Sequence, residues 1–349
     1  MQETELQRLV RMMQEDRLGA LAYQAMTAGL KLDANETALL DRQLTFVEAQ
    51  LYETEYPGLM HRQFIPQDTS TPVWAQSISS KVIDRIEKAS LISDYADNLP
   101  LVDVQLTESM TPVKGVGNGY MYSQRDLQAA TAPMAVNLDA ERAQTARGSI
   151  ERTLDDIACF GDSGAGLKGF VNDDLVDVLT AATVDGDTTW EEKIAGSTAN
   201  GSGPKAVIAD MNEVVNAVNE GTQSVWEATD LLLPTDLYNL IATTPFSAEG
   251  GSDRSILEWF RQNHNGQNGA PLVRVSKWWR LDAANAAGTG GRIVGYARSP
   301  QILVEKAVMP FTMLPPQAKG LAFLIYCWAL TGGTVIKRPK GVKYLDGAN

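Results

Sequence analysis

The segment Asp139–Phe160, DAERAQTARGSIERTLDDIACF, carries the clearest helical pattern in the chain. Its apolar stripe recurs at three- and four-residue spacing and consists of Ala140, Ala143, Ala146, Ile150, Leu154 and Ile157. Charged residues occupy the other side, which is typical of an amphipathic helix. At 1.5 Å per residue the helix is roughly 30 Å long, and Gly161 supplies a C-terminal stop. We predict a long helix with one buried stripe, whose small residues in the first half allow another element to approach closely.

On the N-terminal side, residues 1–72 begin with apolar residues at helical spacing between Glu3 and Leu30, and a second helical stretch covers Glu36–Leu51. Prolines then make the chain irregular as far as Pro72. An amphipathic N-terminal helix can pack on its own domain, or it can form an arm that docks on a neighbouring subunit. The pattern leaves both interpretations open.

Between Val73 and Ser123 the chain is rich in β-branched and aromatic residues, and Leu101–Thr107 alternates as a half-buried strand does. We predict a long β-hairpin whose tip is the turn-rich Ser93–Pro100. In its first arm, Ile78 to Ile86 fits a helix about as well as a strand.

The C-terminal half mixes short helices and strands without a regular βαβ repeat, which indicates an α+β fold. We expect an exposed loop over Asp185–Gly203 around a short helix at Trp190–Ala195. Asp210 and Glu213 form a capping-box signature for a helix that closes at Gly221. The strands and helices expected beyond it are Ala228–Leu233 ended by Pro234, Leu237–Ala242 capped by Thr235 or Asp236, Ile256–Gln262 capped by Ser252 or Asp253, Leu272–Val275, Arg292–Ala297 and Ile302–Val304.

Length and composition indicate an ordinary globular protein. A chain of 349 residues predicts two or more lobes. The longest apolar run, Leu321–Leu330, is about half of the roughly 20 residues that a bilayer span requires, so we predict a buried strand there. The charged residues among Met1–Arg17 do not resemble a signal peptide, and we expect no export.

The net charge and the cysteine content indicate a protein that does not grip nucleic acid and that has reduced thiols. The formal net charge of -13 argues against a protein whose task is to grip nucleic acid. Cys159 and Cys327 each lie in an apolar stretch, as buried reduced thiols of cytoplasmic proteins do.

One motif suggests nucleophilic catalysis. Gly161-Asp162-Ser163-Gly164 matches the sequence around the nucleophile of trypsin-like serine proteases, and His61 precedes Ser163 in the chain order of those enzymes. Those proteases hold the serine in a β-barrel loop, whereas here it follows a long helix. A turn that ends the helix explains both glycines, so a serine hydrolase using Ser163 is only a remote alternative.

The other chemical signals are equally weak. Neither histidine, His61 nor His264, has a metal ligand at a diagnostic spacing, and each is interpreted as a surface or hydrogen-bonding residue. Adjacent carboxylates diverge on a helix or strand, so they are interpreted as solvated charge; the pairs are Asp155 with Asp156 and Asp173 with Asp174.

Two further groups have structural interpretations. Gly115, Gly117 and Gly119 lack the lysine and helix start of a phosphate-binding loop, and we expect a tight turn. Trp278 and Trp279 are expected in a core or an interface. We therefore predict no catalytic, cofactor-binding or metal site and no cofactor.

A series of short motifs in fixed order carries a resemblance. The motifs are Asn98-Leu99-Pro100-Leu101-Val102-Asp103, Gly119-Tyr120-Met121-Tyr122-Ser123, Asp126-Leu127-Gln128-Ala129-Ala130, Arg142-Ala143-Gln144-Thr145-Ala146-Arg147, Ile150-Glu151-Arg152, Gly161-Asp162, Gly166-Leu167-Lys168-Gly169-Phe170-Val171-Asn172, Leu314-Pro315-Pro316-Gln317, Gly320-Leu321, Gly332-Gly333-Thr334-Val335 and Arg338-Pro339. In this order the chain resembles the major capsid proteins of tailed bacteriophages, with the Hong Kong 97-like capsid fold that encapsulins share.

The resemblance implies an α+β capsid fold with named parts. These parts are an N-terminal arm at 1–72, an extended hairpin (E-loop) at 73–112, a peripheral domain at 113–222 and 316–349 that includes the spine helix 139–160, and an axial domain at 223–315.

The implied function is structural and not enzymatic. Subunits would form hexamers and pentamers of an icosahedral head enclosing phage DNA, with the arm and hairpin lying over neighbouring subunits. The implied partners are further copies, a portal protein, and scaffold or decoration proteins, with DNA held only non-specifically and no membrane. The implied location is the virion, assembled in the host bacterial cytoplasm.

Two features of related proteins leave alternatives open. An encapsulin-like nanocompartment shell would share the fold. Some relatives cross-link a hairpin lysine to an asparagine of another subunit, and Lys81, Lys88 and Lys114 are available here.

Overall fold

The computed structural model divides the chain into two compact units, Met1–Pro57 and Gly58–Asn349. It describes residues 57–86, 91, 103–129, 138–196, 203–246, 254–266, 269, 272–286, 288 and 290–349. The expected N-terminal helices, the hairpin tip at 93–100 and Lys88 lie outside the described residues.

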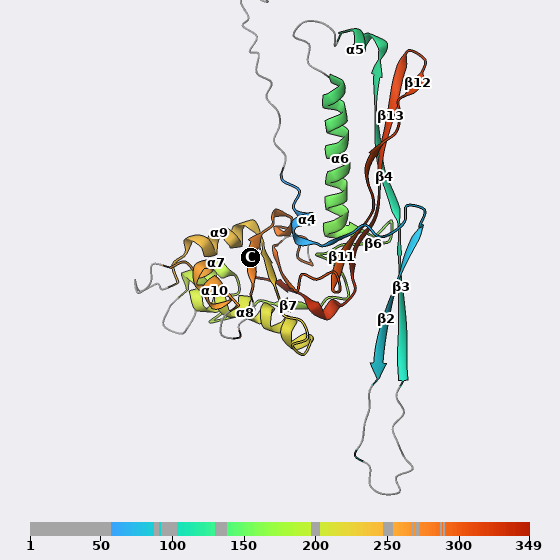
Figure 1. The fold of residues 1–349 in the computed structure, drawn as a ribbon. Helices are drawn as coiled ribbons and strands as arrows, with labels where there is room; N and C mark the ends of the chain where they lie inside the picture. Colours follow the sequence, from blue (N-terminus) through green and yellow to red (C-terminus); the bar gives the residue numbers. More distant parts are fainter. Residues whose placement is uncertain are drawn as a thin grey trace, which may run out of the picture. The chain divides into compact units, whose positions relative to one another are not determined.

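The long helix is confirmed as α6, Leu138–Phe160. It packs along β4, Lys114–Ser123, and β13, Ala322–Ile336, as Figure 1 shows. Its stripe is buried from Ala146 to Ile157, whereas Ala140 is exposed. The apolar contact therefore begins about two turns into the helix.

The helix ends where glycine is required. Gly161 has φ 73°, a left-handed conformation that side chains with a Cβ disfavour. A Cβ on Gly161 would also lie 2.5 Å from the carbonyl oxygen of Leu167. The chain reverses there into a small hairpin of β5, Gly161–Asp162, and β6, Leu167–Lys168.

One five-stranded sheet supports α6. Its strands run in the order β1–β11–β13–β12, with β4 paired to β13. The bounds of the remaining strands are β1 Gln67–Asp68, β11 Leu303–Met313 and β12 Gln317–Lys319. Two short helices lie next to its strands in the sequence: α4, His61–Phe64, precedes β1, and α5, Gln124–Ala129, follows β4.

The tight turn expected at Gly115, Gly117 and Gly119 is wrong, because all three lie within β4. As every second residue of the strand, they share the side of β4 that faces away from α6. A Cβ on Gly119 would lie 3.0 Å from the Ile325 carbonyl oxygen, and one on Gly117 would lie 3.3 Å from that of Cys327. Close approach of the paired strand β13 accounts for these glycines.

The predicted strand at Leu321–Leu330 is confirmed within β13, but it is not uniformly buried. Ile325, Cys327 and Ala329 face α6 and are buried, whereas Tyr326 and Trp328 are exposed. The alternation is that of a strand with only one face covered.

The predicted hairpin is confirmed as two antiparallel strands. β2, Ser77–Ile86, pairs with β3, Asp103–Pro112, from Ser77↔Pro112 to Ile86↔Asp103. The ambiguous first arm is thus a strand.

A second five-stranded sheet has the order β7–β14–β10–β8–β9. Its strands are β7 Val178–Thr180, β14 Val342–Asp346, β10 Arg292–Tyr296, β8 Asp230–Leu233 and β9 Arg274–Lys277. The helices that accompany it in the sequence are α7 Trp190–Ala195, α8 Pro204–Gly221, α9 Thr235–Thr243, α10 Ile256–Asn263 and the 3-10 turns η2 Trp279–Leu281 and η3 Pro339–Gly341.

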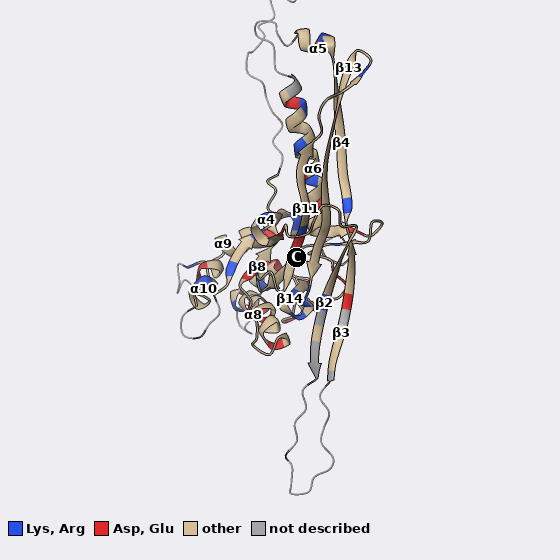
Figure 2. Ribbon diagram, turned by 45° about the vertical axis from the view of Figure 1, so that its right-hand side comes forward, with Lys and Arg blue, Asp and Glu red and all other residues tan. Residues whose placement is uncertain are grey.

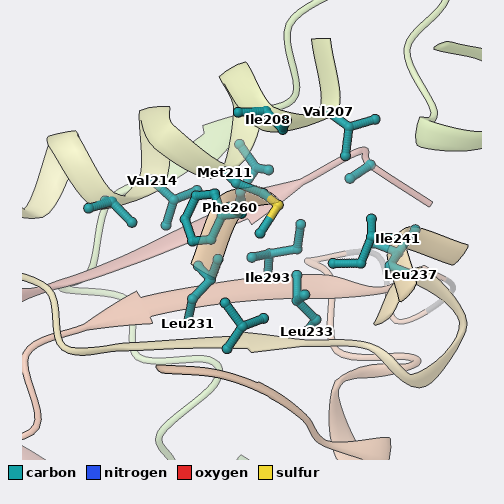
Figure 3. Close-up of a cluster of buried hydrophobic side chains, with 14 of the residues drawn as sticks. Val207, Ile208, Met211, Val214, Leu231, Leu233, Leu237, Ile241, Phe260 and Ile293 are labelled. Carbon is teal, nitrogen blue, oxygen red and sulfur yellow. The ribbon is translucent and has the colours of Figure 1, made fainter. Parts of the chain in front are cut away.

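Both faces of this second sheet are buried. On one face, Leu231 and Ile293 pack with Met211 and Val214 of α8 and with Phe260 of α10, as Figure 3 shows. On the other face, a second cluster contains Leu232, Val294, Tyr344, Phe170 and Trp278. The near-continuous apolar run of β8 follows from burial on two sides.

The capping box expected at Asp210 and Glu213 is wrong, because α8 begins at Pro204 and Asp210 lies inside it. Asp210 accepts hydrogen bonds from Lys193 Nζ at 2.6 Å and Trp190 Nε1 at 2.9 Å. The short helix expected at Trp190–Ala195 is confirmed as α7, and the described residues before it, 185–189, are exposed or half-buried as expected, although Trp190 and Lys193 of the helix itself are fully buried.

The expected caps of the next two helices are also wrong. α9 starts at Thr235 after Pro234, without a side-chain cap. Ser255 caps α10, its hydroxyl accepting from the Glu258 amide. Both helices lie where they were predicted, and their ends differ from the prediction by at most two residues.

The mixed α+β class is confirmed by these sheets, whereas the predicted domain boundaries stay predictions. α8, placed in the predicted peripheral domain, packs on the β8-containing sheet. β11, placed in the predicted axial domain, pairs with β13 of the predicted peripheral domain.

Candidate assembly interface

One face of the β2–β3 hairpin presents exposed apolar side chains, with Lys81 and Glu108 opposite each other on the same face. Ile83 is opposite Leu106 in the register, and alternation places Val104 and Met110 on the same face. The four side chains are 56–68% exposed. We call Ile83, Val104, Leu106 and Met110 the hairpin face.

A two-stranded hairpin with an exposed apolar face has little intrinsic stability in water. Covering one such leucine stabilises by about 1.5–3 kcal/mol. The hairpin face therefore has the chemistry of a surface that another protein covers.

Further large apolar side chains are exposed beyond the hairpin. Trp74, just before β2, is 83% exposed, and Leu321, just before β13, is 78% exposed. Met121, Tyr326 and Trp328 lie on the β4–β13 face opposite α6. Figure 2 shows that long stretches of β4 and β13 carry no charged residue.

A buried charged cluster joins distant segments. His61 Nδ1 lies 2.7 Å from Asp155 Oδ1, and Arg280 Nε donates to Asp155 Oδ2 at 2.8 Å. The other ring nitrogen of His61 lies 3.6 Å from Glu305 Oε1. His61 and Asp155 are almost completely buried, and Arg280 also donates to the exposed Asp156.

The electrostatics of Asp155 reflect two opposing effects. Burial by itself raises the pKa of the Asp155 carboxyl, but the hydrogen bonds from His61 and Arg280 outweigh it and hold the pKa below its usual range. The carboxylate is thus charged and holds the segment around α4 to α6 and to η2.

The interpretation of Asp155 as solvated charge is therefore wrong, whereas that of Asp156 is confirmed by its 60% exposed side chain. Asp173 is also buried, with Lys168 Nζ at 3.1 Å, while Asp174 is exposed. Sequence reasoning missed the burial of Asp155 because its partners His61 and Arg280 lie 94 and 125 residues away in the chain, whereas Lys168 is only 5 residues from Asp173.

The residues that suggested a serine hydrolase lie in different environments. Ser163 is exposed in the turn between β5 and β6, whereas His61 is buried against Asp155. Gly161 and Gly166 have positive φ, as the helix-ending turn requires. His264 lies on the ring of Phe260 and hydrogen-bonds to Asn212.

The remaining candidate residues are also placed. Trp278 is fully buried beside Phe64, as expected of a core tryptophan, and Arg280 lies over the ring of Trp279 at 4.2 Å. Lys81 and Lys114 are exposed, on β2 and β4. Cys159 and Cys327 are buried free thiols.

The described part of the chain lacks two further kinds of feature. It contains no group of three or more His, Cys, Asp or Glu residues arranged to hold a metal ion. None of its helices is long and apolar enough to cross a membrane.

Comparison with known proteins gives one family and several structures. A family model described as "Major capsid protein" matches residues 87–348. No curated protein matches the chain.

Three similar solved structures come from two phages and a GTA particle. The capsid of Myoviridae phage XM1 has a TM-score of 0.71 at 15% identity, covering 87% of this chain and 97% of the other. The capsid of a native GTA particle has a TM-score of 0.60 at 14% identity, covering 91% and 100%. A structure from Mycobacterium phage Bobi has a TM-score of 0.56 at 14% identity, covering 90% and 98%.

Proposed function

Because the chain belongs to the major capsid protein family, a structural and not an enzymatic family, we propose that its copies form hexamers and pentamers that are tied together by the hairpin face. A capsid protein of this kind assembles with copies of itself into the head shell of a phage-like particle. The alternative of a hydrolase using Ser163 is not supported by this family.

The single observation that carries the proposal is the exposure of the hairpin face. Ile83 and Leu106 face each other across the strands, and both are more than half exposed. A second copy that covered these side chains would bury apolar area. The same contact would recur between all neighbouring subunits of a shell, so many weak contacts would together stabilise the assembly. Contacts that join different patches of identical subunits close a shell when the curvature allows.

The proposal also covers the N-terminal segment, the packaged DNA and the other partners. The N-terminal segment acts as an inter-subunit arm, packaged DNA is enclosed without specific contacts, and a portal protein and scaffold or decoration proteins are further partners. The net charge of -13 supports a wall that does not adhere to DNA.

The hairpin proposal is tested by a charge placed on the hairpin face. Leu106→Asp should abolish particles, because a carboxylate cannot be buried without a partner. Ser109→Asp, on the opposite face of the same strand and also exposed, is the matched control and should assemble. Negative-stain electron microscopy and light scattering of the purified proteins measure the outcome.

Three results are informative. A native chain that stays monodisperse and never assembles would contradict the shell function. Particles from Leu106→Asp as abundant as native ones would contradict the role of the hairpin alone. Nuclease-protected DNA in particles would separate a phage head from a nanocompartment that encloses cargo protein.

A further inference from the structure

A basic hollow lies where the hairpin meets the sheet that contains β11 and β13. It has a volume of about 560 Å³. Its charged lining residues are Lys81 of β2, Lys306 of β11, and Lys337 and Arg338 after β13, and its described lining includes no acidic residue. Ser80 adds a hydroxyl donor, whereas the Ser79 hydroxyl donates to Glu108, which lies opposite Lys81 across the hairpin.

The cations in this hollow outnumber their anionic partners. Lys306 Nζ pairs with Asp68 Oδ2 at 2.5 Å. Lys337 Nζ donates to the Pro300 carbonyl oxygen at 2.9 Å, a partner without formal charge. Among the described residues, no ion pair involves Lys81, Lys337 or Arg338.

Crowding of like charge is visible at Lys337. Burial, and then the neighbouring Lys306 cation, lower the pKa of the Lys337 ammonium. An anion in the hollow would favour the charged ammonium and so offset both effects on the pKa of Lys337. A concave site with convergent donors and excess positive charge is suited to a carboxylate or a phosphate.

We propose that the basic hollow binds acidic side chains of a second copy of this chain. This inference rests on the proposed shell function and names a contact within it. Two observations favour a second copy. The chain carries 43 acidic against 30 basic residues, so a neighbouring copy is rich in the complementary charge. Lys81 and Ile83, which line the hollow, also lie on the face of β2 that we propose to be covered by another subunit.

One property of the hollow and one of the whole chain disfavour DNA as the occupant of the hollow. Ile78 and the 60% exposed Ile83 give it an apolar side that suits a peptide better than a sugar-phosphate backbone. Strong binding to DNA requires several phosphates neutralised together, and the net charge of -13 opposes it.

Carbodiimide cross-linking of assembled shells tests the contact directly, because the reagent joins a lysine amine to a touching carboxylate with net loss of water. Shells are reassembled from a mixture of ¹⁴N- and ¹⁵N-labelled subunits, and cross-linked peptides are identified by mass spectrometry. We expect mixed-isotope pairs that join Lys81, Lys306 or Lys337 to Asp or Glu. Links between peptides of the same isotope, such as Lys306 to Asp68, arise within one subunit. If these three lysines give only such links while other lysines give mixed-isotope links, the proposal is overturned.

Charge reversal tests its energetic importance. Lys81→Glu should raise the protein concentration required for assembly at least tenfold at about 0.05 M salt and less at about 0.5 M, because salt screens the new repulsion. Lys205→Glu, an equal charge change on an exposed lysine of α8, should behave as the native protein. Circular dichroism establishes that both variants are folded.

The outcomes separate this inference from the shell function. Failure of the native chain to assemble would contradict the shell function itself. Equal assembly of folded Lys81→Glu and Lys205→Glu would overturn the basic hollow and leave the shell function standing. Normal assembly of Lys81→Glu with reduced retention of DNA would identify phosphate as the ligand and overturn the proposal in favour of DNA.

Discussion

At the scale of the residue, Asp155 is the charge on which three segments depend. Its two oxygens accept from His61 and Arg280, which lie 94 and 125 residues away in the chain. Its neighbour Asp156 shares Arg280 but is 60% exposed. Two adjacent carboxylates of α6 thus differ in burial, and we expect them to differ in their contribution to stability.

Asp155→Asn should lower the free energy of unfolding by about 1.5–3 kcal/mol, because the buried carboxylate that accepts from His61 and Arg280 would be lost, leaving Arg280 with only the exposed Asp156. Asp156→Asn, the matched control, should cost less than about 1 kcal/mol, since an exposed ion pair contributes little. Urea denaturation of the unassembled chain measures both. Equal losses would show that burial of Asp155 has no energetic consequence.

At the scale of the element, β4 depends on glycine for its pairing with β13. Gly119 lies opposite Tyr326 and Gly117 opposite Trp328, both exposed aromatics on the face away from α6. The space for a side chain decreases along the strand. A Cβ on Gly115 would lie 3.4 Å from its nearest atom, Leu330 Cδ2, whereas a Cβ on Gly119 would lie 3.0 Å from the Ile325 carbonyl oxygen.

Gly119→Ala should therefore destabilise by about 1–3 kcal/mol, the usual cost of overpacking. Gly115→Ala, four residues along the same strand, should change stability by no more than about 0.5 kcal/mol, because its Cβ would be in ordinary contact with Leu330. Thermal unfolding followed by circular dichroism compares the two variants. A tolerated Gly119→Ala would mean that β13 moves aside at little cost.

At the scale of the whole molecule, acid should loosen the unit Gly58–Asn349. The pKa of Asp155 is lowered in the folded protein, and that of Asp126 is lowered by the Ser123 amide and by Arg142. A lowered folded pKa means that the unfolded chain binds protons first. The stabilisation is complete above the unfolded value of about 3.9 and is lost as pH falls through the folded value.

We expect the unfolding free energy attributable to these carboxylates to be level at neutral pH and to fall below about pH 4. The Asp155→Asn variant should show a shallower fall than the native chain, since it lacks that titrating group. Urea unfolding between neutral and acid pH measures the slopes. Identical slopes would contradict a lowered pKa at Asp155.

The sequence by itself determined the elements whose signals are local. The stripe of α6, its end at Gly161 and the run of β8 up to Pro234 follow from periodicity and backbone chemistry within a few residues. The ordered motifs also predicted the family, because they span much of the chain.

Tertiary structure alone decided the features that depend on distant partners. Gly115–Gly119 form a strand and not a turn because β13, about 200 residues later, pairs with them. Asp210 is a buried ion-pair partner and not a helix cap because Lys193 and Trp190 reach it. Burial and pairing are set by which segments meet in space, and the local pattern around a residue carries no information about that meeting.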